Sequence, residues 1–281
     1  MDVARIIERA EARNAIGCAV SRARLLNIRP AWLRVDSGIA VFSGPDSPLT
    51  HAVGVGFANI PVPAALNTLE AFFRAGRAPA RLRLAPFVRP EFRREAHRRG
   101  YVSEGVLQVL VRRPAGSSAR MNMRSSVRVD RRNKRFVLAW NTAVAEGFLG
   151  RNINHPVDLQ VAMIISGIRG VHCFAGIREK EFAGGAALVV HGRVAIFFGD
   201  ATKPDFRGKG VHRSLIRARL HAARNAACEW CVAAAVPGSA SERNYKAAGF
   251  SAAYPVMRLI LPSARRSFRL DHTPFEIGAF G

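Results

Sequence analysis

The residues best suited to chemistry stand between an apolar strand and a helix. The sequence predicts a strand over Val194–Gly199 and an amphipathic helix that begins at Val211, with Arg207-Gly208-Lys209-Gly210 before the helix. Glycines let a ligand approach the backbone, and the N–H groups and dipole of a helix N-terminus favour an anion. Arg207 and Lys209 would add cationic donors. The segment suits a pyrophosphate, although a tight turn without a ligand explains these four residues equally well.

Two motifs in order point to a known family. The string TKPDFRGKGV at 202–211 resembles the acyl-CoA-binding motif of the GCN5-related N-acetyltransferase (GNAT) superfamily, which reads Gln or Arg, x-x-G-x, then Gly or Ala. The string PGSASERNYKAAGF at 237–250 is similar to a later helix of that family, which ends in an aromatic residue, a few residues and Gly-Phe. The resemblance covers residues 130–262, and His212 departs from it because the family pattern has Gly or Ala there.

The resemblance implies a cofactor and a reaction. An amine would attack the thioester carbonyl of acetyl-CoA, the co-substrate, and the thiolate would leave with a proton. The backbone near the end of the fourth strand would pair with the pantetheine arm, and amides of the loop would hold the pyrophosphate. The residues implied for the cofactor are Ala201, Thr202, Arg207, Gly208, Lys209, Gly210, Val211, His212, Arg213 and Asn244.

Three residues are candidates for acid–base work. The resemblance implies that Tyr245, four residues before Gly249, is the general acid that protonates the thiolate. Asp200 or Glu229 could accept the proton of the amine, directly or through a water. Each has a structural alternative, since Tyr245 could pack as an ordinary helix aromatic and the carboxylates could be solvated or capping groups. An amine that loses its proton to solvent would need neither carboxylate.

The order of the predicted elements is alike in the two halves of the chain, which resembles a divergent tandem repeat. With the family resemblance this implies an α/β (α+β) fold of two tandem GNAT-like domains. Each would be a mixed, mostly antiparallel sheet flanked by helices. The expected boundaries are 1–113 for a degenerate domain, 114–128 for a linker, 129–262 for the acetyl-CoA-binding domain and 263–281 for an unassigned tail.

The first half lacks the residues of a phosphate loop. The predicted strand His51–Phe57 is followed by Ala58-Asn-Ile-Pro-Val-Pro-Ala64, which holds no Arg and no Gly. Its two prolines cannot donate a backbone N–H. We therefore expect this half to bind no CoA and to act as a structural or substrate-flanking partner.

The sequence also predicts the first elements of each half. An amphipathic helix is expected over residues 2–17 of the first half. In the second half the pattern predicts a strand over Phe136–Trp140, then helices over Thr142–Leu149 and Val157–Ile168. A meander of strands leads from there to the chemically interesting loop.

The composition offers a second class of function. The chain of 281 residues has 43 Lys+Arg against 20 Asp+Glu, a net charge of +23, which invites a nucleic-acid partner. The surplus is divided evenly, with +12 in residues 1–128 and +11 in 129–281, and only five of the basic residues are Lys. This even spread favours a solvated basic surface over a nucleic-acid surface. A non-catalytic GNAT-fold module for a polyanion, or a CoA sensor, is the alternative function.

The remaining expectations concern partners, metal and location. The acceptor would be a small amine or a peptide or lysine amine, and the protein a monomer or homodimer. Cys228-Glu-Trp-Cys231 is a single C-x-x-C pair, which is too few ligands for zinc, so burial is expected and no metal site. Without an apolar run of about 18 residues or a leader-like start, no membrane is expected and the protein should be cytoplasmic.

Overall fold

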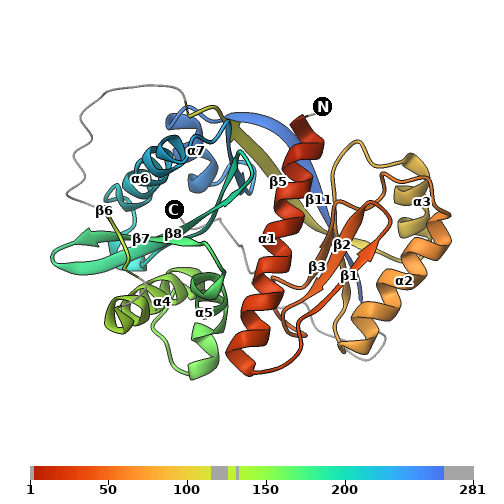
Figure 1. Cartoon of the computed structure of the whole chain (residues 1–281), viewed down its shortest axis with the longest axis horizontal. Coiled ribbons are helices and arrows are strands. Elements are labelled where there is room, and N and C mark those ends of the chain that lie inside the picture. Colours follow the sequence, from red (N-terminus) through yellow and green to blue (C-terminus); the bar gives the residue numbers. More distant parts are fainter. Residues whose placement is uncertain (1–2, 115–125, 131–132, 263–281) are drawn as a thin grey trace. The chain divides into compact units, whose positions relative to one another are not determined.

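The computed structural model describes residues 3–114, 126–130 and 133–262, and the chain divides into two compact units (Figure 1). The first unit takes the described residues up to Leu107 and those from Tyr254 onward. The second unit holds the described residues of Gln108–Ala253. The predicted tail at 263–281 lies outside the described residues, as does most of the predicted linker.

The sheet of the first unit combines three antiparallel pairs with one parallel pair. Its strand order is β1-β2-β3-β4-β11, and β3 and β4 are the parallel pair. Two glycines with left-handed φ, Gly54 and Gly56, end β3 earlier than the sequence predicts. The elements are α1 (Val3–Leu26), β1 (Ala31–Val35), β2 (Gly38–Phe42), β3 (His51–Val53), α2 (Val62–Ala75), β4 (Ala80–Leu84) and α3 (Pro90–Arg98).

The sheet of the second unit repeats that pattern. Its strand order is β6-β7-β8-β9-β10-β5, where β9 and β10 are parallel and the other neighbours antiparallel. The elements are β6 (Ser126–Arg128), α4 (Lys134–Leu149), the 3-10 turn η2 (Pro156–Leu159), α5 (Gln160–Gly167), β7 (His172–Arg178), β8 (Glu181–His191), β9 (Val194–Thr202), the 3-10 turn η3 (Pro204–Phe206), α6 (Val211–Asn225), β10 (Trp230–Ala235) and α7 (Ala240–Ala247). Residues 126–128, expected in the linker, form β6.

The last strand of each sheet comes from the other half of the chain. Strand β5 (Val102–Arg112) ends the first half, yet Gln108–Arg112 pairs with β10 of the second unit. Strand β11 (Ser251–Leu261) ends the second half, yet Met257–Leu261 pairs with β4 of the first unit. The boundaries expected at 113 and 262 therefore differ from the units observed. A hydrophobic pattern predicts a strand but does not say which neighbour the strand will choose.

Helices cover both faces of each sheet. In the first unit, Leu66 and Phe73 of α2 and Phe92 of α3 pack on Leu82 and other inward residues of the sheet. The opposite face of β2 and β3 packs on Ala15 and Ala19 of α1. In the second unit, α6 and α7 bury one face of the sheet, with Leu215, Ile216 and Tyr245 at the centre.

Helix α4 corrects the predicted strand at Phe136–Trp140. The side chain of Asn133 caps the helix by accepting from the N–H groups of Arg135 and Phe136, and Gly150 ends it in the left-handed conformation. Trp140, Ala143, Val144 and Gly147 are buried at helical spacing. The run of aromatic and branched residues at the helix start suggests a strand. The cap at Asn133 and the helical spacing of the buried residues show that the segment is a helix.

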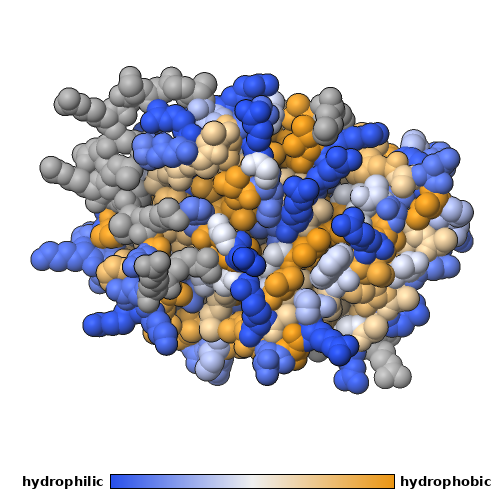
Figure 2. All heavy atoms as spheres, in the orientation of Figure 1, coloured by the Kyte–Doolittle hydropathy of each residue, from blue (hydrophilic) through white to orange (hydrophobic). Residues whose placement is uncertain are grey.

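Polar residues cover the exterior broadly. Figure 2 shows hydrophilic residues distributed over the whole visible face, in line with the even spread of Arg along the sequence. Within the described residues, every helix is too short or too polar to cross a membrane.

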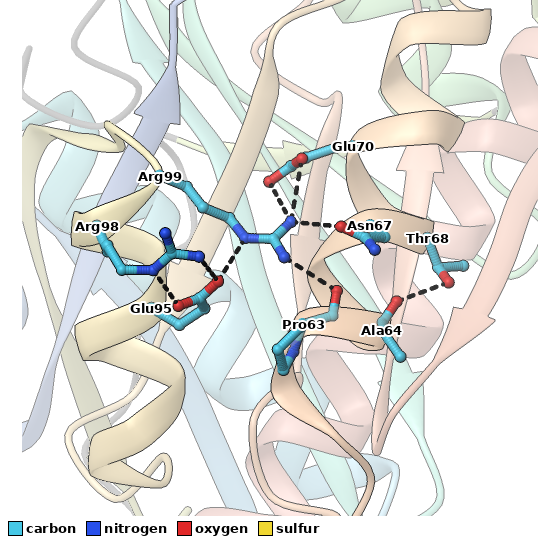
Figure 3. Close-up of polar contacts among 8 residues, drawn as sticks. All are labelled: Pro63, Ala64, Asn67, Thr68, Glu70, Glu95, Arg98 and Arg99. Carbon is cyan, nitrogen blue, oxygen red and sulfur yellow. Dashed lines mark hydrogen bonds and ion pairs between the residues drawn. The ribbon is translucent and has the colours of Figure 1, made fainter.

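One arginine ties two helices of the first unit together. Arg99 follows α3, and Figure 3 shows its guanidinium between that helix and α2. It donates to Glu95 at 2.9 Å, to Asn67 at 2.7 Å and to Glu70 at 3.2 Å, and also to the carbonyl of Pro63 at 3.2 Å. The Arg99 side chain is only 16% exposed, and its bonds to Glu95 and Glu70 are partly buried, whereas those to Asn67 and Pro63 lie at the surface.

Arg98 provides a matched control for this contact. Replacing Arg99 with Ala should lower the free energy of unfolding by about 2–3 kcal/mol, because the partly buried Glu70 loses its charged partner and the bonds to Asn67 and Pro63 are lost with it. Replacing Arg98, whose side chain is 72% exposed and bonds only Glu95, should cost under about 1 kcal/mol. Urea unfolding of both variants measures the difference. Equal losses would show that Arg99 does not join the helices.

Candidate functional site

The loop between β9 and α6 has the backbone of an anion cradle. Gly210 is the N-cap of α6 with φ 79°, and Gly208 has φ 72°. A Cβ at either glycine would meet nothing within 4 Å, so left-handed backbone rather than crowding requires glycine. The first N–H groups of α6, beginning at Val211, have no partner inside the helix. The loop and helix start therefore present donors at a positive helix end.

The side chain of Arg207 braces the loop. Its guanidinium donates to the carbonyl of Thr202 at 3.4 Å and to that of Gly147 in α4 at 3.3 Å. On the other side of the loop, Arg178 from β7 donates to the carbonyl of Lys209 at 2.8 Å. In these contacts the arginines bond carbonyl oxygens of the backbone, so the N–H groups of the loop remain available for an anion. The guanidinium of Arg207 thus holds the loop in place through protein carbonyls and is not directed toward a ligand.

The cations on the open side of the loop are Lys209 and Arg213. Both side chains are exposed. The ammonium of Lys209 lies 5.3 Å from the ring centre of Phe206 and 3.9 Å from the carboxylate of Glu179. The side chain of Glu179 is 72% exposed, so this ion pair is a weak one. Lys209 and Arg213 can therefore turn toward an anionic ligand.

The strands β9 and β10 separate before they reach the loop. Among the described residues they pair only from Trp230–Val232 to Val194–Ile196. Beyond that point β9 continues to pair with β8, up to Thr202 opposite Gly184. Strand β10 instead continues with β5, up to Ala235 opposite Gln108. The edge of β9 that carries Ala201 and Thr202 is thus released from its parallel neighbour.

A bulge in β9 turns Asp200 toward α6. Phe198 and Ala201 lie opposite Ala187 and Gly185, so β9 holds one more residue than β8 at this point. Gly199, with φ 66°, takes the left-handed conformation in the bulge. An extra residue shifts the alternation of side chains, which brings Asp200 to the same face as Phe197.

Asp200 is the centre of a buried polar cluster. Its carboxylate is in ion contact with Arg219 of α6, whose side chain is fully buried. The hydroxyl of Tyr245 in α7 donates to Asp200 at 2.6 Å. Arg219 also donates to the Tyr245 oxygen at 3.2 Å and to the carbonyl of Ala187 at 3.2 Å. Three elements, β9, α6 and α7, meet in this cluster.

The cluster sets the protonation of Asp200 and Tyr245. Burial alone would raise the pKa of Asp200, but the charge of Arg219, with help from His212 and Tyr245, holds that pKa well below its usual range. Burial raises the pKa of Tyr245 well above its usual value, and the carboxylate of Asp200 acts in the same direction although Arg219 opposes it. Asp200 is thus a paired carboxylate and a weak base. Tyr245 is 1% exposed and its proton is directed at Asp200.

His212 and Asn244 belong to the same cluster. Nε2 of His212 lies 3.2 Å from Asp200, and its Nδ1 lies 3.2 Å from the amide nitrogen of Asn244. The imidazole packs edge-on against Tyr245, with ring centres 5.4 Å apart. Both side chains therefore face inward, and His212, only 4% exposed, leaves the outer side of the cradle clear.

Glu229 does not join the other predicted residues. It precedes β10, beside Arg193, at the end of β9 where the parallel pairing begins. The loop follows the opposite end of β9, which at about 3.3 Å per residue is roughly 26 Å away. Its carboxylate pairs with Arg193 at 2.9 Å, and its side chain is 43% exposed. The geometry removes Glu229 from the candidates for a base.

The sequence analysis missed Arg219. A signal was present, since Val211, Leu215, Arg219 and Ala223 follow one another at four-residue spacing. A charged residue inside the apolar stripe of a helix indicates a buried partner. The two cysteines of the C-x-x-C pair are buried as expected, and burial raises the pKa of both thiols, to about 12 for Cys231. In the described parts of the chain, no group of three His, Cys, Asp or Glu could hold a metal.

The cluster should behave as a buried ion pair. Replacing Asp200 with Ala leaves Arg219 buried without a counter-charge and should cost about 3–5 kcal/mol of unfolding free energy. The double variant Asp200→Leu with Arg219→Met should lose much less, because both charges go together. Glu229→Gln, which breaks the exposed pair with Arg193, is the control and should cost under about 1 kcal/mol. Denaturant unfolding measures these losses. A double variant that loses as much unfolding free energy as Asp200→Ala, or more, would contradict the pairing.

Comparison with known proteins identifies the fold. No protein-family model and no curated protein matches the sequence significantly. Among solved structures, the chain is similar to a GCN5-related N-acetyltransferase from Kribbella flavida, with TM-score 0.63 and 14% identity, over 89% of this chain and 96% of that one. It is also similar to a tandem GNAT protein from the clavulanic acid biosynthesis pathway, with TM-score 0.55 and 14% identity, over 88% of each chain.

A third similar structure is a GCN5-related N-acetyltransferase from Sphaerobacter thermophilus, with TM-score 0.55 and 12% identity over 75% of this chain and 70% of that one. At such identities the likeness concerns the fold and not the reaction. It confirms the resemblance and the fold class expected from the two motifs. The repeated sheet of the two units agrees with the tandem neighbour. This chain has the fold of the GCN5-related N-acetyltransferase superfamily, in tandem form.

Proposed function

We propose that the second unit binds acetyl-CoA and transfers its acetyl group to an amine. The observation that carries this proposal is the separation of β9 from β10 beside the cradle at Gly208–Gly210. The released edge of β9 offers backbone groups for an extended chain of amides such as pantetheine. The cradle, in the loop that follows β9, offers donors for a pyrophosphate. One ligand with both parts would fit both features.

Each predicted cofactor residue has a part in this arrangement. The peptide groups of Ala201 and Thr202 would bond the pantetheine arm, and the N–H groups from Gly208 into the first turn of α6 would hold the pyrophosphate. Lys209 and Arg213 would neutralise the phosphates from outside. Arg207, His212 and Asn244 would support the cradle from within, since their side chains already bond protein groups.

The acid–base roles differ from those that the resemblance implies. In the transfer, the nitrogen of the amine bonds the carbonyl carbon, the carbon–sulfur bond breaks and the thiolate takes up a proton. Asp200 is committed to Arg219, and Tyr245 directs its proton at Asp200. We therefore assign both a positioning role. The amine would lose its proton to solvent, and the thiolate would gain one from solvent or from the amine. The first unit would serve as a structural partner.

Acetyl-CoA binding can be tested with two charge reversals. Isothermal titration calorimetry should show binding by the wild type. Lys209→Glu with Arg213→Glu should weaken it at least about tenfold, which corresponds to ~1.4 kcal/mol for lost phosphate contacts. Arg217→Glu reverses one charge at an exposed position one turn further along α6 and should alter the Kd less than about threefold. A wild type that binds no acetyl-CoA at millimolar concentration would rule out the proposal.

The role of Tyr245 can be tested with Tyr245→Phe. As a positioning residue it should leave kcat, measured as CoA release with a panel of primary amines, within about threefold of the wild type, and the pH profile unchanged. A general acid would lose about 10²–10⁴-fold. Retained acetyl-CoA affinity in calorimetry serves as the control for folding. A fall of a hundredfold in kcat with intact binding would restore the acid role. Binding without CoA release by the wild type would favour a CoA sensor.

A further inference from the structure

The first unit contains a loop that holds a buried carboxylate. The loop follows β3 and leads into α2, which is the place of the β9–α6 loop in the second unit. The Oδ2 atom of Asp36 accepts from the N–H groups of Gly56 at 2.5 Å, Phe57 at 3.1 Å and Ala58 at 3.4 Å. The side chain of Asp36 is fully buried. Three successive N–H groups around one oxygen form the kind of nest that binds anions.

The rest of this loop completes the surroundings of the carboxylate. Nη2 of Arg89, at the start of α3, lies 4.0 Å from the second oxygen of Asp36 and donates to the carbonyl of Ile60 at 2.9 Å. The N–H of Arg89 donates to the carbonyl of Gly56 at 3.0 Å. Burial would raise the pKa of Asp36, but hydrogen bonds from the backbone and hydroxyl of Ser37 and from the N–H groups of Gly56 and Ala58 lower it. The loop therefore stabilises a negative charge, which is that of the Asp36 carboxylate.

In the second unit the corresponding hairpin contacts its loop through a hydrogen-bond donor, whereas Asp36 is an acceptor. Asp36 lies in the turn between β1 and β2, and the equivalent turn between β7 and β8 holds Glu179. There Arg178 donates to a loop carbonyl, and Glu179 stays exposed. The second loop is open, since a Cβ at Gly208 or Gly210 would meet nothing within 4 Å, whereas one at Gly56 would meet Val88 at 3.0 Å.

We propose that the loop of the first unit is an oxyanion site and that the Asp36 carboxylate occupies it in place of a phosphate. The first unit is then closed to phosphate ligands by its own side chain, in addition to lacking the basic residues of a phosphate loop. Removing the carboxylate should leave three converging N–H groups and Arg89, which suit inorganic phosphate. This inference concerns the first unit alone and stands whether or not the second unit binds acetyl-CoA.

The test follows the amide signals of Gly56, Phe57 and Ala58 by NMR during a titration with inorganic phosphate. In the wild type these signals should stay in place up to about 50 mM phosphate, because the nest is filled. In Asp36→Gly they should shift and saturate at millimolar concentration. Glycine suits the left-handed backbone of this position, φ 56°, so the variant removes the carboxylate without straining the turn.

Two comparisons keep the test decisive. Asp46→Gly removes an exposed carboxylate from another loop of the same unit, and its three nest amides should remain unmoved. Asp36→Asn keeps an oxygen in the nest, so its nest amides should also stay in place with phosphate, and Asp36→Ala, which removes the carboxylate, replaces Asp36→Gly if that variant does not fold. In the wild type, hydrogen exchange should be slower at Gly56 and Phe57 than at Gly208 and Lys209 without ligand. Nest amides that ignore phosphate in folded Asp36→Gly or Asp36→Ala, that shift in the wild type, or that exchange as fast as the second loop would each overturn the proposal.

Discussion

The second unit depends on the buried ion pair between Asp200 and Arg219. The pair joins the middle of α6 to the bulge of β9, and Tyr245 extends it to α7. Because a buried charge without a partner is costly, the three elements are held where all the charges and hydroxyls are satisfied. The same contacts direct His212 inward and leave the start of α6 free for a ligand. The cluster thus joins β9, α6 and α7 beside the loop.

The two units show two outcomes of one topology. In each, a hairpin turn reaches the loop that leads from a parallel strand into a helix. In the second unit an arginine bonds a loop carbonyl, which leaves the N–H groups available. In the first unit an aspartate bonds the N–H groups themselves. Both turns carry a carboxylate, but Asp36 is buried against the N–H groups of its loop, whereas Glu179 stays exposed and leaves those of the second loop free of it.

Local signals in the sequence were sufficient for the loop, but not for every element. Glycines at 208 and 210, followed by an amphipathic helix, predict the cradle because left-handed backbone and helix termini are local properties. The predicted strand at Phe136–Trp140 was wrong because five residues rich in aromatic and branched side chains are compatible with a strand and with a helix. Only the cap at Asn133 and the burial of Trp140 and Val144 decide for helix.

The sequence by itself determined the fold family, the position of the cradle and the lack of a phosphate loop in the first half. Tertiary structure decided which strand completes which sheet, since β5 and β11 each pair in the other half's unit. It also decided the partners of Asp200, Tyr245 and Asp36, because the sequence does not say which group a carboxylate or a phenol will contact. Asp200 meets Arg219 and Tyr245, which are 19 and 45 positions away along the chain. Distance along the chain hides such contacts, and only folding reveals whether a charge faces solvent, a ligand or another charge.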